Sequence, residues 1–224
     1  MSSATKIIAI DGPVGTGKST VAKEVARRMG FAFLDTGAMY RAATWRALHL
    51  GLSLDDAPAL AESTRAMKLE ICENENGQQV LVDGHDVTDA IRTPEITKLI
   101  YKLDQEPAVR RHLVALQQSF GEMQPTVAEG RDIGTVVFPK AKCKIYLDAS
   151  VDVRAERRAL QMEEKGMTVD RDQLKADIAD RDHKSMTRAD SPLRQAEDAI
   201  LVDTSHLTIE EVVERLLSLA RERL

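Results

Sequence analysis

Five short apolar runs rich in β-branched residues recur along the chain, and stretches with helical periodicity separate them. The runs cover residues 6–10, 31–34, 126–128, 144–147 and 200–202. Runs of this length and composition predict buried strands, and their alternation with helices predicts a parallel sheet with helices on both faces. The pattern therefore indicates an α/β fold with a five-stranded parallel sheet.

The interval between the second and third runs, residues 37–124, has a different pattern. Two shorter β-patterned runs, 67–72 and 79–82, flank the sequence Asn-Glu-Asn-Gly at 74–77, and Asp-Gly follows at 83–84. Asn-Gly and Asp-Gly are typical of tight turns in β-hairpins. We therefore expect a small antiparallel insert in this interval, separate from the main sheet.

A glycine-rich string, GPVGTGKS, follows the first apolar run at residues 12–19 and precedes a helical pattern. It fits the phosphate-binding loop G-x-x-x-x-G-K-[ST], in which backbone N–H groups converge on phosphate oxygens. Lys18 is expected to bridge the β- and γ-phosphates and Ser19 to ligate Mg²⁺, at the positive end of the helix dipole. The nucleotide-binding residues predicted from the string are Gly12, Pro13, Val14, Gly15, Thr16, Gly17, Lys18, Ser19 and Thr20.

Composition narrows the class of protein. The 224 residues carry a formal net charge of −5, which argues against a surface that wraps nucleic acid. The two cysteines, Cys72 and Cys143, form no C-x-x-C pair, and no apolar stretch reaches the length of a signal peptide or a membrane span. We therefore expect a reduced, soluble, cytoplasmic protein without membrane contact.

Two further strings stand at the carboxyl ends of predicted strands. DTGAMYR covers residues 35–41, and EGRDIGTVVFP covers residues 129–139. Ligands of open parallel sheets bind beyond the carboxyl ends of the strands, so both strings are candidates for the site of the phosphate loop. The simpler alternatives are a helix capped by Asp35 or Thr36, and a tight turn with a local ion pair between Arg131 and Asp132.

A fourth string, IADRDHKSMTRADSPL at residues 178–193, places Arg181 and Arg188 seven positions apart. Seven residues are about two helical turns, so both guanidinium groups are expected on one side of a helix. Two such cations suit the spread charge of a phosphoryl group in transfer. A solvated helix whose arginines pair with neighbouring aspartates is the alternative.

Taken together, the four strings resemble the bacterial cytidylate kinase family, and the similarity extends from Ile7 to the C-terminal helix. The resemblance implies transfer of the γ-phosphoryl group of ATP, with Mg²⁺, to CMP or dCMP, giving ADP and CDP or dCDP. It also implies a core at residues 1–36, 109–153 and 169–224, a short lid at 154–168, and a nucleoside monophosphate (NMP)-binding domain. That domain would span residues 37–108, with the antiparallel insert at about 66–90.

The resemblance further implies roles for single residues. Arg41, Arg131 and Arg188 correspond to a clamp on the CMP phosphate, and Arg110 and Asp132 to the readers of the cytosine base. A carboxylate that accepts from the 4-amino group would disfavour UMP. The implied catalytic residues are Lys18, Arg131, Arg188, Arg157 and Arg158. The implied acceptor-binding residues are Thr36, Tyr40, Arg41, Tyr101, Arg110, Arg131, Asp132, Arg181, Ser185 and Arg188.

Two positions depart from the family pattern. Tyr101 stands where a small hydroxyl residue is usual near the base, and Ser185 where an aspartate is common near the ribose. Ser185 lacks the charge-assisted acceptor, so the preference between CMP and dCMP stays open, as does the tolerance of UMP.

Two other functions remain as alternatives. One is a sibling P-loop kinase that acts on UMP, AMP or shikimate, and the pairing of Arg110 with Asp132 argues against it. The other is a nucleotide-sensing module, but the N-K-x-D string of guanine-specific switches is absent from the sequence. The favoured interpretation is a monomeric enzyme with small-molecule substrates.

Overall fold

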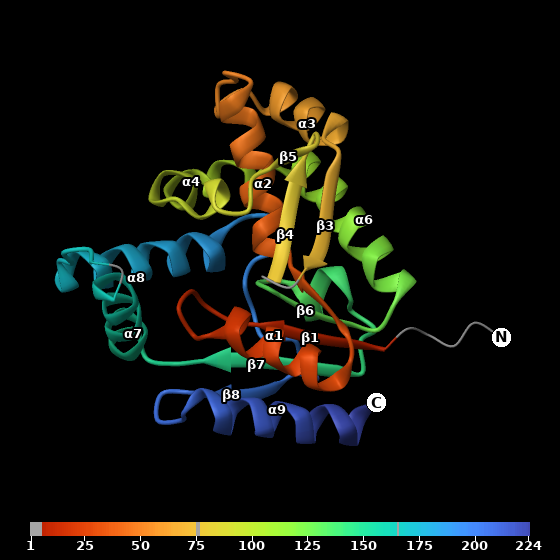
Figure 1. Cartoon of the computed structure of the whole chain (residues 1–224), viewed down its shortest axis with the longest axis vertical. Helices are drawn as coiled ribbons and strands as arrows, with labels where there is room; N and C mark the ends of the chain where they lie inside the picture. Colours follow the sequence, from red (N-terminus) through yellow and green to blue (C-terminus); the bar gives the residue numbers. More distant parts are fainter. Residues whose placement is uncertain (1–5, 75–76, 165) are drawn as a thin grey trace. The chain divides into compact units, whose positions relative to one another are not determined.

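The structure, a computed structural model, describes residues 6–74, 77–164 and 166–224 (Figure 1). The chain divides into two compact units. Unit 1 consists of Met1–Leu34 and Ser119–Leu224, and unit 2 of Asp35–Gln118. Unit 2 is therefore an insertion between two segments of unit 1. The finer boundaries predicted above, including those of the lid, stay a prediction.

Unit 1 is built on a five-stranded parallel sheet in the order β2-β6-β1-β7-β8. The strands are β1 (Ile7–Asp11), β2 (Ala32–Asp35), β6 (Thr126–Gly130), β7 (Cys143–Asp148) and β8 (Ile200–Asp203). β1 lies in the centre, where it pairs in parallel with β6 and β7, and β7 pairs in parallel with β8. Each of the five apolar runs forms a strand whose ends differ from the prediction by at most two residues, which confirms the predicted sheet.

Helices cover both faces of this sheet. The helical segments of unit 1 are α1 (Lys18–Met29), the end of α6 (Pro107–Met123), η2 (Ile133–Val137), α7 (Val151–Glu163), α8 (Arg171–Thr187) and α9 (Ile209–Arg223). Successive side chains of a strand point to opposite faces. Ile8 and Ile10 of β1 pack in the core formed with α1 and α9, whereas Asp11 binds η2 and Ile7 lies beside Gly121 of α6.

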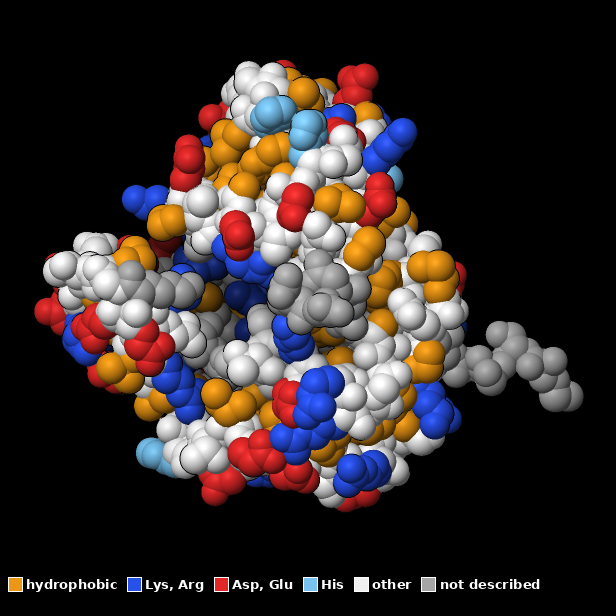
Figure 2. All heavy atoms as spheres, viewed as in Figure 1, with side chains coloured by type: hydrophobic (Ala, Val, Ile, Leu, Met, Phe, Trp, Pro, Cys, Tyr) orange, Lys and Arg blue, Asp and Glu red, His pale blue; other side chains and the backbone are white. Residues whose placement is uncertain are grey.

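Ion pairs join α1 and α9 at the surface of unit 1. Arg28 of α1 donates to Glu24 in its own helix and to Glu210 and Glu214 of α9, at 2.6–2.9 Å. Figure 2 shows the basic and acidic side chains intermixed over these two helices. Exposed ion pairs contribute little each, so the apolar residues beneath them hold the helices together.

Unit 2 contains a three-stranded antiparallel sheet, β3-β4-β5, and several helices. Its elements are α2 (Thr36–His49), α3 (Ala57–Ala66), β3 (Leu69–Asn74), β4 (Gly77–Val82), β5 (His85–Asp86), η1 (Ala90–Arg92), α4 (Pro94–Leu99), α5 (Tyr101–Asp104) and the start of α6. The antiparallel insert is thus confirmed. Asp83 and Gly84 have φ values of 51° and 84°, as an Asp-Gly hairpin turn requires. The first predicted turn includes Glu75 and Asn76, which lie outside the described residues.

Candidate functional site

The glycine-rich loop joins β1 to α1 in unit 1. Gly12 has a φ of +150°, and a Cβ at this position would lie 2.0 Å from the carbonyl oxygen of Leu147. Gly17 is the left-handed N-cap of α1, with a φ of 88°. Both positions therefore need glycine. The loop leads directly into the N-terminus of α1, the end of the helix that attracts anions, as the motif predicts.

Lys18 is the first residue of α1 and is only 5% exposed. Its Nζ donates to the carbonyl oxygen of Pro13 at 2.6 Å. Burial, together with the positive charge of Arg131, lowers the pKa of Lys18 to about 7, against the opposing effect of nearby carboxylates. Two cations in a poorly solvated place repel each other, and an anion between them relieves the repulsion. The loop is therefore prepared for phosphate.

Two carboxylates at strand ends belong to the same site, and neither is among the site residues predicted from the sequence. Glu129, in β6, accepts from the Oγ of Ser19 at 2.6 Å. Asp11, the last residue of β1, accepts from the backbone N–H groups of Ile133 and Gly134 at 2.7 Å each. Burial raises the pKa of Asp11 to about 7, although these two N–H groups favour its ionised form. The sequence feature that could have predicted these two site residues is an acidic residue at the end of an otherwise apolar strand.

The oxygen atoms beside the loop fit a magnesium ion. Mg²⁺ prefers hard oxygen ligands, and proteins hold it through one or two groups together with substrate phosphates and water. Ser19 is exposed at the start of α1, and its hydroxyl donates to the carboxylate of Glu129. Ser19 therefore meets the requirements of the predicted metal ligand, and Glu129 is a second candidate.

Arg131 and Asp132 link β6 to η2, a π-helical turn. Asp132 is buried and forms an ion pair with the Nη2 of Arg188 at 3.4 Å. Arg188 also donates through Nε to the carbonyl oxygen of Ser191 at 2.7 Å. The structure thus brings the predicted base reader, Asp132, into contact with a predicted phosphate ligand.

The prediction that Arg181 and Arg188 share one side of a helix is wrong. Helix α8 ends at Thr187, and Arg188 is its C-cap with an extended backbone at φ −60° and ψ 142°. The chain leaves the helix at this point because the buried Arg188 side chain pairs with Asp132. Arg181 and Ser185 do lie on α8, and both are half-buried.

The two predicted lid arginines have different surroundings on α7. Arg157 donates to the hydroxyl and carbonyl oxygens of Thr204 at 3.1 and 2.6 Å, and to the carbonyl oxygen of Leu207 at 3.4 Å. Arg158 is exposed. In this structure Arg157 therefore holds the segment between β8 and α9, and Arg158 is the arginine accessible from solvent.

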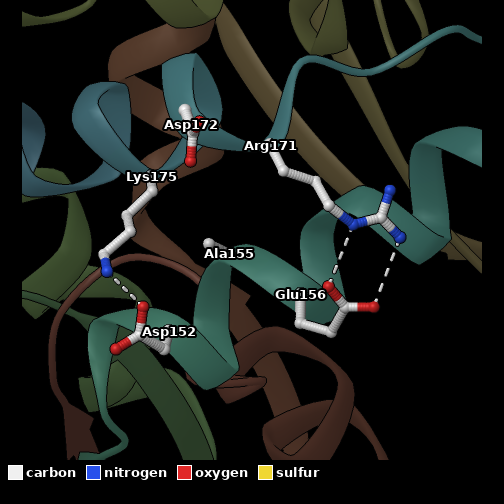
Figure 3. A pocket seen from close by; sticks show the side chains of 6 residues that line it. All are labelled: Asp152, Ala155, Glu156, Arg171, Asp172 and Lys175. Atoms are coloured by element: carbon white, nitrogen blue, oxygen red, sulfur yellow. Dashed lines mark hydrogen bonds and ion pairs between the residues drawn. The ribbon is translucent and has the colours of Figure 1, made fainter.

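A pocket opens between α7 and α8 (Figure 3). Its lining residues are Asp152, Ala155, Glu156, Arg171, Asp172 and Lys175. Ion pairs cross it from Lys175 to Asp152 and, at 3.1 Å, from Arg171 to Glu156. These ion pairs join the two helices. Because both cations already have carboxylate partners, the pocket lacks the excess positive charge of a phosphate site.

In unit 2, Asp35 is the N-cap of α2 and accepts from the N–H of Ala38 at 2.8 Å, which selects Asp35 from the two predicted caps. Its second carboxylate oxygen accepts from the Nη2 of Arg41 at 2.8 Å. The Nε–H of Arg41 is buried and has no acceptor among the described residues. A fixed cation with a buried donor to spare suits an anionic ligand. Thr36, which follows Asp35 in the sequence and begins α2, is buried.

Arg110 and Tyr40 form a second group in unit 2. Arg110, only 2% exposed, lies over the ring of Tyr40 at 5.6 Å from its centre, and donates to the carbonyl oxygen of Asp104 at 3.2 Å. A guanidinium on an aromatic face is held in one plane. Tyr101 begins α5 and is half-buried, with the ammonium of Lys102 at 5.7 Å from its ring centre.

The fold and the loop define the class of protein. A phosphate loop between the central strand and the first helix of a parallel sheet, with a buried lysine and oxygen donors for a metal, is typical of P-loop phosphotransferases. The family model for cytidylate kinase matches residues 8–222. The chain therefore belongs to the cytidylate kinase family.

Individual relatives agree with this result. The chain is 48% identical over 224 residues to a cytidylate kinase of Rhodococcus jostii, covering 100% of this chain and 98% of the relative. It is 46% identical over 216 residues to a cytidylate kinase of Enterococcus faecalis, covering 96% of each. It is 50% identical over 219 residues to a bifunctional pantoate ligase/cytidylate kinase of Synechocystis, covering 96% of this chain and 43% of that longer protein.

One solved structure, of an uncharacterized protein from Eubacterium ventriosum, aligns with 98% of this chain and 99% of its own, with a TM-score of 0.52. At 12% identity this likeness concerns the fold alone.

Proposed function

We propose that this chain is a nucleoside monophosphate kinase that transfers the γ-phosphoryl group of ATP to CMP or dCMP, giving ADP and CDP or dCDP. The observation that carries the proposal is the match of nearly the whole chain to the cytidylate kinase family. The buried lysine of the phosphate loop supports ATP as the donor. A kinase for UMP, AMP or shikimate, and a nucleotide-sensing module, are not favoured.

The donor is assigned to the loop of unit 1. The N–H groups of residues 12–20 would surround the phosphates of ATP, and Lys18 would bridge the β- and γ-phosphates. The negative charge of the phosphates would favour the ammonium form of Lys18, reversing the effect of burial on its pKa. Ser19, with Glu129 beside it, would hold Mg²⁺. When bound, Mg²⁺ would neutralise charge on the phosphate oxygens of ATP.

We assign the phosphate of CMP to Arg41, Arg131 and Arg188, the cytosine to Arg110 and Asp132 with Tyr101 nearby, and the remaining acceptor contacts to Thr36, Tyr40, Arg181 and Ser185. Two contacts support the assignment. Asp35 fixes the Arg41 guanidinium, and Arg188 balances the charge of Asp132 before the base arrives.

The reaction needs no strong base. The acceptor oxygen is already anionic and the transition state of phosphoryl transfer is loose, so catalysis consists of positioning and charge neutralisation. Lys18 and Arg131 would stabilise charge on the transferred group. Arg158, exposed on α7, is the lid arginine that is accessible to approach the phosphates, whereas Arg157 would first have to leave Thr204. Closure of the lid would exclude water and suppress ATP hydrolysis.

An acceptor series tests the proposal. ADP release is measured in a coupled assay with ATP, Mg²⁺ and CMP, dCMP, UMP or AMP at equal concentrations. We expect CMP and dCMP to support turnover well above the rate without acceptor. Turnover highest with AMP or UMP would favour a sibling kinase, and ATP binding without turnover on any acceptor would favour a sensing module.

Changing Asp132 to Asn is expected to narrow the discrimination between CMP and UMP. The carboxylate accepts from the 4-amino group, whereas an amide also donates to the 4-carbonyl of uracil. The ratio of kcat/KM for CMP to that for UMP should fall by about tenfold, the effect of one charge-assisted hydrogen bond. Asp198→Asn, which removes an exposed carboxylate paired with Lys144, is the control. An unchanged ratio in Asp132→Asn would show that the base is read elsewhere.

We also propose a cytoplasmic monomer that binds no nucleic acid. The net charge of −5 supports the last point. Over the part of the chain that the structure describes, no helix combines the length and apolar character needed to cross a membrane.

A further inference from the structure

Val14, in the phosphate loop, is held by two side chains from outside the loop. Its backbone N–H donates to Oδ1 of Asp182 at 3.0 Å, and its carbonyl oxygen accepts from Nη1 of Arg154 at 2.8 Å. Arg154 lies on α7 and Asp182 on α8, 140 and 168 residues further along the chain. Both polar backbone groups of this loop residue are thus fixed by the helices that form the pocket of Figure 3.

Arg154 and Asp182 also form an ion pair with each other. Both are buried, at 4% and 6% exposure. The Nε of Arg154 donates in addition to the carbonyl oxygen of Ala149 at 2.9 Å. The planar guanidinium therefore binds two backbone carbonyls and one carboxylate at once, which the single ammonium of lysine does not reproduce. A buried pair with this many partners holds one geometry.

Arg154 restricts the next loop residue as well. A Cβ at Gly15 would lie 3.2 Å from the Cβ of Arg154, and Gly15 has a φ of 80°. The first turn of α7 therefore packs directly against the loop backbone. By contrast, the ion pairs that cross the pocket, such as Arg171 with Glu156, are exposed and join side chains of α7 and α8 to each other. Among the described residues, the buried pair Arg154–Asp182 is the one that binds both the N–H and the carbonyl oxygen of Val14.

We propose that Arg154 and Asp182 are positioning residues for the phosphate loop. Together they fix Val14 so that the neighbouring N–H groups keep the arrangement that receives the donor phosphates. This role rests on the proposed function, in which the loop binds ATP. Release of Val14 weakens ATP binding, while the acceptor-binding residues keep their own contacts.

The test compares two aspartates of α8. Asp182→Asn removes the charge opposite Arg154 and leaves one oxygen for two donors. Asp180→Asn is the matched control, because Asp180 is exposed on the same helix and pairs with Lys184 at 2.7 Å. Calorimetry gives the Kd for ATP with Mg²⁺ and no acceptor, and nuclear magnetic resonance gives the exchange rate of the Val14 amide. We expect Asp182→Asn to raise the Kd about tenfold and to accelerate exchange at Val14, with neither change in Asp180→Asn.

A double variant separates positioning from folding. Replacing a buried ion pair with apolar residues of similar size is often neutral for stability, so Arg154→Met with Asp182→Leu is expected to unfold near the wild-type temperature. It should nevertheless bind ATP as weakly as Asp182→Asn, since the pair acts as a unit. A folded double variant with the wild-type Kd for ATP and slow exchange at Val14 would overturn the proposal.

The failure of the proposed function looks different. If the wild-type protein binds no ATP, the donor assignment is wrong. If the wild type binds ATP and both folded variants bind it equally well, only the positioning role is wrong. A rise in the KM for CMP with an unchanged Kd for ATP would likewise contradict the role, because Val14 belongs to the donor loop.

Discussion

Replacing Lys18 with Met is expected to lower kcat/KM for phosphorylation of CMP by about 10³-fold, because one fixed charge at the transferred phosphate is worth several kcal/mol. Methionine keeps the unbranched apolar stem of lysine and is one atom shorter, so the loss reports mainly the missing ammonium group. The expected cause is the missing cation between the β- and γ-phosphates. Steady-state kinetics with CMP and ATP measure the effect, and a variant within about tenfold of the wild type would contradict the role of Lys18.

The same change should leave the fold intact. Burial lowers the pKa of Lys18 from 10.5 to about 7, so the ammonium form costs folding free energy that builds up as the pH falls below 10.5 and is complete below about 7. Removing the charge removes this cost, and the temperature of unfolding should stay level or rise. Lys23→Met, on the exposed side of the same helix, is the control and should alter neither kinetics nor stability.

Replacing Gly12 with Ala is expected to have the largest effect on stability. The new Cβ would lie 2.0 Å from the carbonyl oxygen of Leu147, in backbone that side chains rarely adopt. Either the loop or β7 must move, because the new Cβ would clash with backbone atoms of Leu147 and not with a side chain that could change its rotamer. Overpacking and backbone strain together should cost about 4 kcal/mol, which lowers the temperature of unfolding by roughly 10 °C.

Gly30→Ala separates the clash from the strain. Gly30 also has a positive φ, of 65°, but a Cβ there would meet nothing within 4 Å. It should cost about 1 kcal/mol from strain alone. Thermal unfolding of both variants gives the comparison. Equal losses of stability in the two variants would show that the clash with Leu147 has no effect. Backbone strain at positive φ would then account for both losses.

The sequence predicted the parts of the fold that depend on local signals. Strand β1 could be recognised because its apolar run is followed at once by the glycine spacing of the loop, and the insert because Asp83 and Gly84 favour a hairpin turn. The end of α8 could not. Residues 181–188 have no proline or glycine to stop the helix, and Arg188 leaves it because of a partner, Asp132, that is 56 positions away in the sequence.

The candidate site was predicted where one string of residues carries the chemistry, as with Lys18 and Ser19. It was missed where single residues act through distant contacts. Glu129 meets Ser19 across 110 positions, and Asp11 meets Ile133 across 122. Asp182 is one of the aspartates that the alternative of a solvated helix pairs with arginines, although it binds Val14 across 168 positions. A single acidic residue in a sequence does not indicate which distant residue it will contact, because that contact depends on the order of the strands in the sheet.

The order of the main sheet also has a consequence for the growing polypeptide on the ribosome. The central strand β1 is made first, but both of its neighbours, β6 and β7, come after residue 125. β1 and the loop that follows it therefore wait, unpaired, while the whole of unit 2 is synthesised. Unit 2 is continuous in sequence and can acquire its own contacts during this time. An apolar nascent strand that waits this long is exposed to aggregation, so conditions that slow translation through residues 35–118 should increase the demand for chaperones.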